Sequence, residues 1–149
     1  MNLIIGASSG LGNSLAKCFV RLGKTFLVSR KKIQLDLNLN NAKKIIFDIT
    51  NGNTTKLIKL IKKNSLSNII FTVGLIDWSN DDINISDKSS RAIVDTNFYY
   101  VARLIYQLIK KKKLKKKLFN LFLLISYNDF TKTSSNYVLC SEICLKFFL

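Results

Sequence analysis

The stretch Gly6-Ala7-Ser8-Ser9-Gly10-Leu11-Gly12 directly follows the apolar run of residues 3–5 and precedes a helical pattern. Glycines permit positive φ and let the backbone approach a pyrophosphate closely, while free N–H groups at a helix N-terminus attract its charge. The spacing is not that of a P-loop, which would need glycine at position 11. The stretch predicts a nucleotide-binding turn, and the alternative is a glycine-rich turn that only lets strand and helix pack.

Short apolar runs alternate with longer helical patterns along the rest of the chain. The runs typical of buried strands cover residues 3–5, 25–29, 44–47, 68–73 and 118–126. Helical periodicity predicts helices over residues 11–22, about 54–64 and about 91–112, and a last one from Ser134 or Ser135 to the end. The order β-α-β-loop-β-α-β-α-β-α predicts an α/β fold with a doubly wound parallel sheet of five strands, in one domain over residues 1–149.

Two segments fit no regular element. Residues 31–41 alternate Leu35, Leu37 and Leu39 with polar residues, which indicates either a short amphipathic insert or a strand-like extension. Residues 77–90 are polar and hold four Asp, which predicts a surface loop that leads into the third helix.

The composition of the 149 residues excludes several classes of protein. A hydrophobic content of 48% is too high for an intrinsically disordered chain. Without histidine there is no Ser-His-Asp triad or His-containing zinc site, and three cysteines cannot supply a Cys₄ site, so we expect no metal. The cysteines lack the paired spacing of a secreted disulfide framework, so we expect a cytoplasmic location.

No signal peptide and no membrane span is expected either. The first residues lack a basic start. The longest apolar stretch, residues 121–125, is far shorter than the roughly 18 residues that a span needs. We therefore expect no membrane partner.

The formal charge of +15 comes mostly from lysine, since 24 Lys and Arg face 9 Asp and Glu. A chain rich in Lys, Asn and Ile is what an AT-rich coding sequence produces without selection for basic residues. The densest run begins at Lys110 and ends at Lys117, where cations suit the C-terminal dipole of the predicted helix. No aromatic residues alternate with these lysines, so nucleic acid is not the expected partner, and polyanion binding remains an alternative.

The glycine turn resembles the cofactor turn of the short-chain dehydrogenase/reductase family, written T-G-x-x-x-G-x-G, with Ile5 where Thr is common. That resemblance implies a Rossmann-like fold that binds a nicotinamide dinucleotide. It implies cofactor contacts from Gly6, Ser8, Ser9, Gly10, Leu11, Gly12, Arg30, Asp48, Ile49 and Gly74.

The implied cofactor is NADP rather than NAD. Arg30, helped by Lys31 or Lys32, follows the second strand and would pair with the 2′-phosphate of NADP, where a carboxylate would accept the ribose hydroxyls of NAD. Asp48 is similar to the acidic residue that contacts the adenine ring in the family. Of the family's Asn-Asn-Ala-Gly, this sequence keeps Gly74.

The family transfers a hydride between nicotinamide and an alcohol or carbonyl, using an Asn, a Ser, a Tyr and a Lys four residues after the Tyr. The resemblance implies Asn97, Ser126 and Tyr137 in three of these roles, but the Lys position holds Ser141. A reductase of this kind would act on an unknown small alcohol or carbonyl.

A second alignment replaces the whole catalytic set. It places Cys140 at the Tyr position, Cys144 at the Lys position and Tyr127 at the Ser position. The two cysteines would then lie four residues apart on one face of the predicted last helix. Two functions besides an active reductase stay open, a non-catalytic NADP-binding or interaction module and a polyanion-binding protein.

Family members are longer and add two further strands and a substrate-enclosing loop. The resemblance therefore implies a truncated or frameshifted chain whose sheet is incomplete at its C-terminal edge. It also implies that the two long helices of the family's dimer interface are partly bare, so a homo-oligomer is expected.

Overall fold

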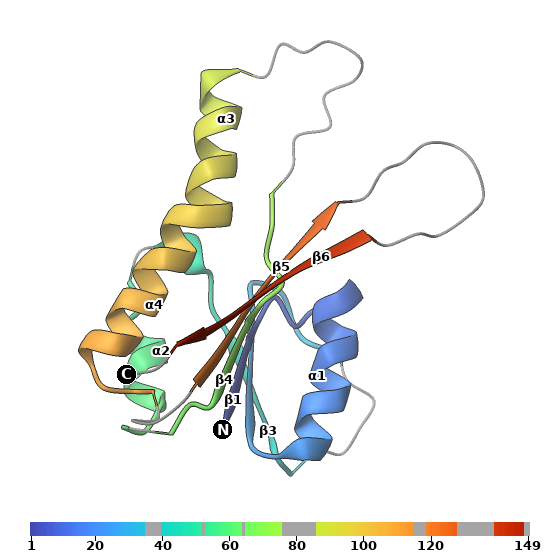
Figure 1. Cartoon of the computed structure of the whole chain (residues 1–149), viewed down its shortest axis with the longest axis vertical. Helices are drawn as coiled ribbons and strands as arrows, with labels where there is room; N and C mark the ends of the chain where they lie inside the picture. The colour runs from blue at the N-terminus through green and yellow to red at the C-terminus, as the bar shows by residue number, and fades with distance from the viewer. Residues whose placement is uncertain are drawn as a thin grey trace, which may run out of the picture.

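The structure is a computed structural model that describes residues 1–34, 40–51, 53–63, 65–75 and 86–114, and the backbone of residues 119–127 and 139–147. Its strands are β1 Asn2–Ile5, β2 Thr25–Ser29, β3 Ala42–Ile46, β4 Asn68–Phe71, β5 Phe119–Tyr127 and β6 Leu139–Phe147. Its helices are α1 Gly10–Leu22, α2 Thr55–Leu60, α3 Asp87–Val94 and α4 Tyr100–Lys110. A 3₁₀ turn spans Ile49–Asn51, and a π-helical turn at Asp95–Tyr99 joins α3 and α4 into one long helix (Figure 1).

Within the described residues, the strands form one sheet in the order β3-β2-β1-β4-β5-β6. All neighbouring strands from β3 to β5 are parallel, and β6 is antiparallel to β5. The chain winds from β1 outward to β3 and then returns to continue from β4 on the other side, so the switch in direction lies between β1 and β4. The predicted doubly wound fold is confirmed.

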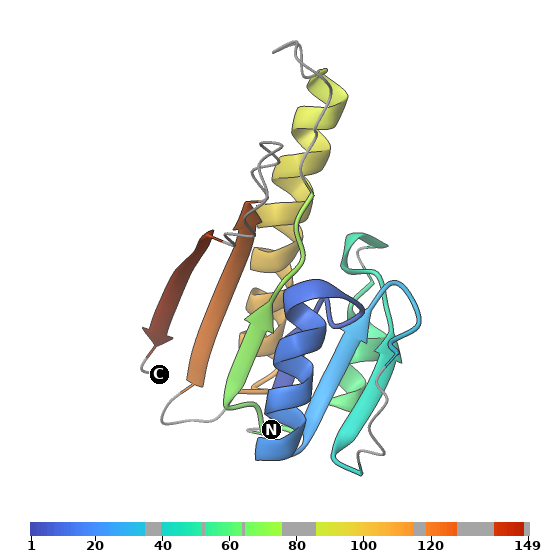
Figure 2. The same cartoon turned by 90° about the vertical axis from the view of Figure 1, so that its right-hand side faces the viewer.

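Helices cover both faces of this sheet. Figure 2 shows α1, in dark blue, in front of the strands and the long helix, in yellow and orange, behind them. On the α1 side, Ile4 and Leu27 pack against Ala16 and Val20. On the other side Leu3 and Ile5 belong to the larger core cluster, which includes Leu57 of α2 and the α4 residues Val101, Leu104 and Leu108.

The central strands are apolar on both faces, as a sheet between two helical layers requires. All four residues of β1 and all five of β2 are buried. The prediction of a buried strand was wrong for residues 44–47, because β3 is an edge strand, and the side chain of Ile46 is 71% exposed.

The last predicted helix is also wrong. Residues 139–147 form β6, which pairs with β5 from Tyr127↔Leu139 to Phe119↔Phe147. The sequence LCSEICLKF has apolar residues at both helical and alternating spacing. The open edge of β5 favours a strand over a helix here, because a paired strand satisfies backbone groups of β5 that would otherwise stay unpaired. The five predicted strands thus form the parallel part of the sheet, and β6 is added to it.

Smaller differences concern element boundaries. Helix α2 is shorter than the predicted 54–64, and the long helix begins at Asp87, inside the segment predicted to be a loop up to residue 90. The side chain of Ser86 accepts a hydrogen bond from the Ser89 amide and caps that helix. Residues 35–39 and 76–85 lie outside the described residues. In the described part of the chain, no helix combines the length and apolar character needed to cross a membrane.

Candidate functional site

A pocket of about 260 Å³ opens where the carboxyl ends of β1, β2, β3 and β4 meet, at the switch point of the sheet. Ligands of doubly wound folds bind at this position, because the loops after adjacent strands diverge there and leave a crevice. Of the residues predicted to bind a cofactor, those that line the pocket are Gly6, Ser8, Ser9, Arg30, Asp48, Ile49 and Gly74.

The glycine turn passes very close to the end of β4. Gly6 has a φ of +100°, and a Cβ atom there would lie 2.5 Å from the Thr72 hydroxyl oxygen. A Cβ atom on Gly12 would overlap the carbonyl oxygen of Gly6. The amides of Gly6 and Ala7 both donate to the Val28 carbonyl, at 2.8 and 3.1 Å. The turn is therefore held against β2 and β4 by contacts that only glycine allows at positions 6 and 12.

The start of α1 points its N-terminus at the pocket wall formed by Ser8 and Ser9. Ser9 is the N-cap residue, and its side chain makes no capping hydrogen bond. The backbone N–H groups of the first helical turn thus keep their capacity to bind an anion. Gly10 and Leu11 begin the helix and do not line the pocket.

The loop after β2 brings two cations to the pocket. The Ser29 hydroxyl donates to the Lys31 carbonyl at 2.9 Å and accepts from the Lys31 amide at 3.0 Å. This closed turn fixes the backbone on either side of Arg30. Arg30 and Lys31 are exposed and line the pocket, so their charges face any anion bound there.

The loop after β3 brings one carboxylate. Asp48 Oδ1 accepts from the Thr50 amide at 2.9 Å and from the Thr50 hydroxyl at 2.7 Å. These bonds fix the carboxylate beside the pocket and start the 3₁₀ turn. Ile49 points into the larger core cluster, which anchors this loop to the sheet.

Asn97 lies in the π-helical turn and holds the loop after β4. Its side-chain Nδ2 donates to the Leu75 carbonyl at 2.9 Å, and its Oδ1 accepts from the Leu75 amide at 2.7 Å. Because π-helical turns insert an extra residue, they reorient a helix locally and are frequent at functional sites. Here the turn places Asn97 against Leu75, and it places Thr96, which precedes Asn97, in the pocket lining.

For the other predicted catalytic residues, the structure describes at most the backbone. Tyr137 lies outside the described residues. The backbone of Ser126 pairs with that of Cys140 in the β5–β6 ladder, and that of Ser141 pairs with Ile125. The interpretation that puts Cys140 and Cys144 on one helix face is wrong, since a strand rises about 3.3 Å per residue and separates their Cα atoms by about 13 Å.

Several pocket residues were not predicted from the sequence. Phe47, Thr50, Thr72 and Thr96 line the pocket, and each neighbours a predicted residue within two positions. Their position in the sequence could have identified them, because residues that follow the ends of adjacent parallel strands converge at one edge of the sheet. No group of three or more metal-ligating side chains occurs within the part of the chain that the structure describes.

No protein-family model and no curated protein matches this sequence. Solved structures do. The chain is similar to a carbonyl reductase from Pseudomonas aeruginosa PAO1, with a TM-score of 0.66 and 21% identity, over 77% of this chain and 55% of that one. It is similar to a short-chain dehydrogenase from Leptospira borgpetersenii with bound NAD⁺, with a TM-score of 0.61 and 18% identity, over 74% of this chain and 46% of that one.

A variant of ElxO with NADPH bound is also similar, with a TM-score of 0.59 and 16% identity, over 76% of this chain and 52% of that one. The chain therefore spans about half the length of the structures that it matches. At identities this low, the similarity establishes the fold alone. The sheet and helices have the arrangement found in short-chain dehydrogenase structures.

Proposed function

We propose that this chain binds a nicotinamide dinucleotide at the carboxyl edge of its sheet, as the cofactor-binding part of an oxidoreductase of the short-chain dehydrogenase type. The observation that carries the proposal is the packing of Gly6, Gly12 and Thr72, which brings the N-terminus of α1 to the pocket. NAD⁺ and NADPH are bound in two solved structures of the same fold.

The pocket residues fit a dinucleotide in chemistry and in order along the edge. The N-terminus of α1 suits the pyrophosphate, Asp48 can accept from an adenine amino group, and Arg30 with Lys31 suits a phosphate near the adenosine ribose. The pocket volume of about 260 Å³ lies just below the roughly 300–1,000 Å³ that is typical of small-molecule sites. A nicotinamide dinucleotide held by these residues would supply hydride transfer to a carbonyl or from an alcohol.

Fluorescence titration tests the binding step directly. NADPH added to the purified chain should give a saturable change in its emission. Gly12→Val should abolish this change, because its side chain would displace the turn from β4. Failure of the original chain to saturate at millimolar NADPH would overturn the proposal.

We propose that Arg30 makes the site prefer NADP over NAD. Removing a charged hydrogen-bond partner costs about 1.5–3 kcal/mol, so Arg30→Asp should weaken NADPH binding by about 10- to 100-fold. NADH binding should stay the same or improve, since the new carboxylate can accept ribose hydroxyls. Arg21→Asp is the matched control, because Arg21 is exposed in the last turn of α1 and changes the net charge equally. Equal NADPH affinities in both variants would show that Arg30 does not face the phosphate.

Turnover distinguishes an active reductase from a non-catalytic binding module. NADPH oxidation with a panel of small carbonyls should be lost in Tyr137→Phe if Tyr137, with Ser126 and Asn97, carries the chemistry. Ser141, four residues after Tyr137, offers no cation to assist the phenol, which favours the binding module. Saturable NADPH binding without turnover on any carbonyl would support that second function.

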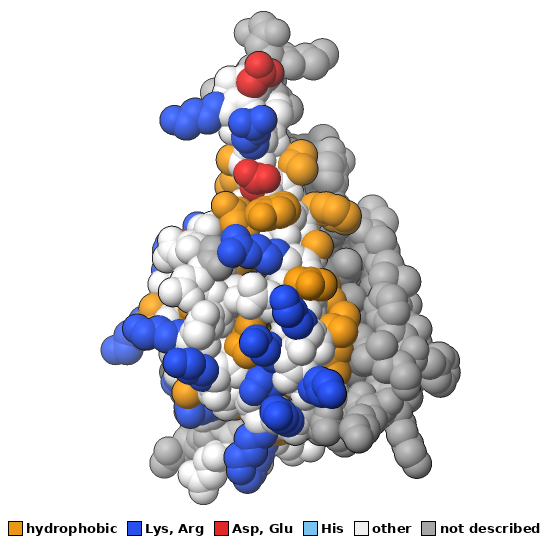
Figure 3. All heavy atoms as spheres, turned by 90° about the vertical axis from the view of Figure 1, so that its left-hand side faces the viewer, with side chains coloured by type: hydrophobic (Ala, Val, Ile, Leu, Met, Phe, Trp, Pro, Cys, Tyr) orange, Lys and Arg blue, Asp and Glu red, His pale blue; other side chains and the backbone are white. Residues whose placement is uncertain are grey.

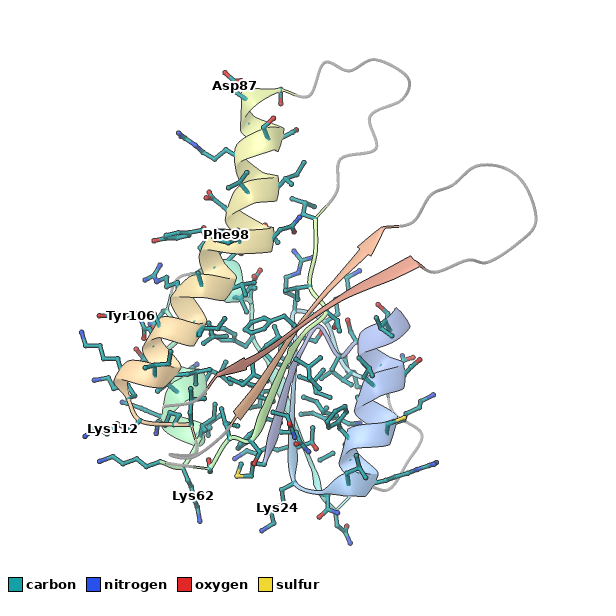
Figure 4. The ribbon with its side chains drawn as sticks, in the orientation of Figure 1. Lys24, Lys62, Asp87, Phe98, Tyr106 and Lys112 are labelled. Atoms are coloured by element: carbon teal, nitrogen blue, oxygen red, sulfur yellow. The ribbon has the colours of Figure 1, made fainter. Side chains whose placement is uncertain are left out.

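We propose that a second copy of the chain covers the outer face of α3 and of the π-helical turn. Val94 and Phe98 lie one turn apart on this face, and the Phe98 ring is 73% exposed (Figure 4). Of the two long helices expected to form an interface, the described residues contain this one, whereas residues 139–147, predicted to belong to the other, form a strand. Light scattering should report a dimer, and Phe98→Ser should shift it to the monomer. A monomeric original chain would refute this contact.

A further inference from the structure

Two lysine-rich segments meet at the end of the molecule opposite the pocket. The Lys113 carbonyl accepts from the amides of Ser65 and Leu66 at 3.0 and 3.1 Å, and its ammonium donates to the Ile61 carbonyl. An isolated bridge between Leu66 and Leu114 continues this contact. These bonds join the segment after α2 to the end of α4, although about fifty positions separate them in the sequence.

The contact gathers exposed cations from both segments, which we call the basic end: Lys59, Lys62, Lys63, Lys110, Lys111 and Lys112. The sequence holds no Asp or Glu between Asp48 and Asp77, nor between Asp95 and Asp129. No carboxylate within either segment can neutralise these lysines. Figure 3 shows blue side chains gathered over the lower part of this face, with acidic ones only toward the upper end.

Apolar side chains are exposed among these lysines. Leu60 and Ile109 are each 41% exposed and are sequence neighbours of Lys59 and Lys110. Tyr106 is 61% exposed, with the Lys110 ammonium 5.8 Å from its ring centroid. In Figure 4, Tyr106 and Lys112 project to the left from the long helix, and Lys62 projects downward from the lower end of the molecule. The surface is therefore cationic and apolar at once.

We propose that the basic end docks the protein on the surface of an anionic phospholipid bilayer. Clustered lysines attract anionic headgroups, and apolar or aromatic side chains beside them enter the boundary with the acyl chains. Lysine stems contribute apolar surface while their ammonium groups stay in water. This proposal revises the sequence-based expectation of no membrane partner, which rested on the absence of a signal peptide and of an apolar stretch long enough to span a membrane.

Phospholipid fits this surface better than nucleic acid does. The basic end is built from lysine, a hydrated point charge, and lacks arginine, whose planar fork suits the recognition of nucleic acid. The ammonium of Lys110 lies over the Tyr106 ring, where a base would have to stack. Docking through this end would leave the pocket facing water, since the two lie at opposite ends of the parallel strands.

Vesicle co-sedimentation tests the docking. The chain should bind vesicles of phosphatidylcholine with phosphatidylserine, bind far less to phosphatidylcholine alone, and be released by high salt. Lys62→Glu with Lys63→Glu should weaken vesicle binding on the order of a hundredfold, since each lysine near an anionic surface strengthens the binding and each glutamate is repelled by it. The control, Lys17→Glu with Lys88→Glu, changes the net charge equally at exposed positions outside the basic end and should stay within about threefold of the original.

A second arm separates insertion from charge. Tyr106→Ser with Ile109→Ser should weaken vesicle binding while leaving its salt dependence unchanged. Circular dichroism melts confirm that each variant folds, and Lys62→Ser with Lys63→Ser replaces the charge reversal if that variant does not fold.

Three results would overturn the proposal. Equal losses in the two charge-reversal pairs would show that net charge alone drives binding. Equal binding to vesicles with and without phosphatidylserine would remove the role of the lysines. Stronger binding to duplex DNA than to anionic vesicles, lost in the Lys62 and Lys63 variant, would assign the basic end to nucleic acid.

Discussion

Replacing Gly12 with alanine tests the close contact on which the candidate site depends. Alanine is favoured over glycine inside a helix by about 0.8–1 kcal/mol, so at an open helical position the change would stabilise the protein. At Gly12 the new Cβ would overlap the Gly6 carbonyl oxygen and press on the Thr72 hydroxyl. Overpacking costs about 1–3 kcal/mol, and the upper part of that range applies because a backbone carbonyl cannot rotate away. We expect a net destabilisation of about 2 kcal/mol.

Urea unfolding followed by circular dichroism measures this change. Lys17→Ala, at an exposed position of the same helix, should change the free energy of unfolding by less than about 0.5 kcal/mol. Adding Thr72→Ala to Gly12→Ala removes the hydroxyl contact but not the carbonyl contact, so it should relieve little of the effect. If Gly12→Ala were as stable as the original protein, the turn would not pack against Gly6 as described, and the reasoning would fail.

Three further predictions concern the long helix. Asn97→Ala removes both hydrogen bonds to Leu75, which should cost about 1–3 kcal/mol and speed hydrogen exchange at the Leu75 amide; unchanged exchange there would argue against the clamp. Lys112 follows α4 and its C-cap residue Lys111 with a φ of +50°, so Lys112→Gly should raise stability by up to about 1 kcal/mol, and a lower Tm would contradict this. Ser86→Ala removes the cap on the Ser89 amide and should cost about 0.5–2 kcal/mol in urea unfolding, whereas no change would mean that solvent replaces the cap.

The sequence was sufficient for the first half of the fold because its signals there are local. The apolar run before Gly6 and the helical period after Gly12 lie next to each other, so β1 and α1 could be bounded to within a residue. The same holds for β2, whose five residues match the predicted 25–29. A strand buried on both faces and a helix of three turns leave patterns that few other structures share.

Residues 139–147 were predicted wrongly because their pattern is compatible with two structures. Their apolar residues recur at both helical and alternating spacing. The strand is favoured by pairing with the backbone of β5, and the local sequence of residues 139–147 does not reveal that partner. The same cause explains β3, where the run 44–47 is apolar enough for a central strand but lies at the edge. Tertiary position decides burial in both cases, and a single segment does not encode it.

The candidate site divides along the same line. The turn at Gly6, the cation at Arg30 and the carboxylate at Asp48 each follow a strand directly, so strand order alone places them together. The role of Thr72 could not be foreseen, because it depends on how closely β4 passes behind the glycine turn. The hydrogen bond from Asn97 to Leu75 likewise depends on a π-helical turn, which no local sequence pattern predicts. The sequence therefore predicts which side chains follow the strand ends, but it does not predict the packing that sets the distances between those side chains.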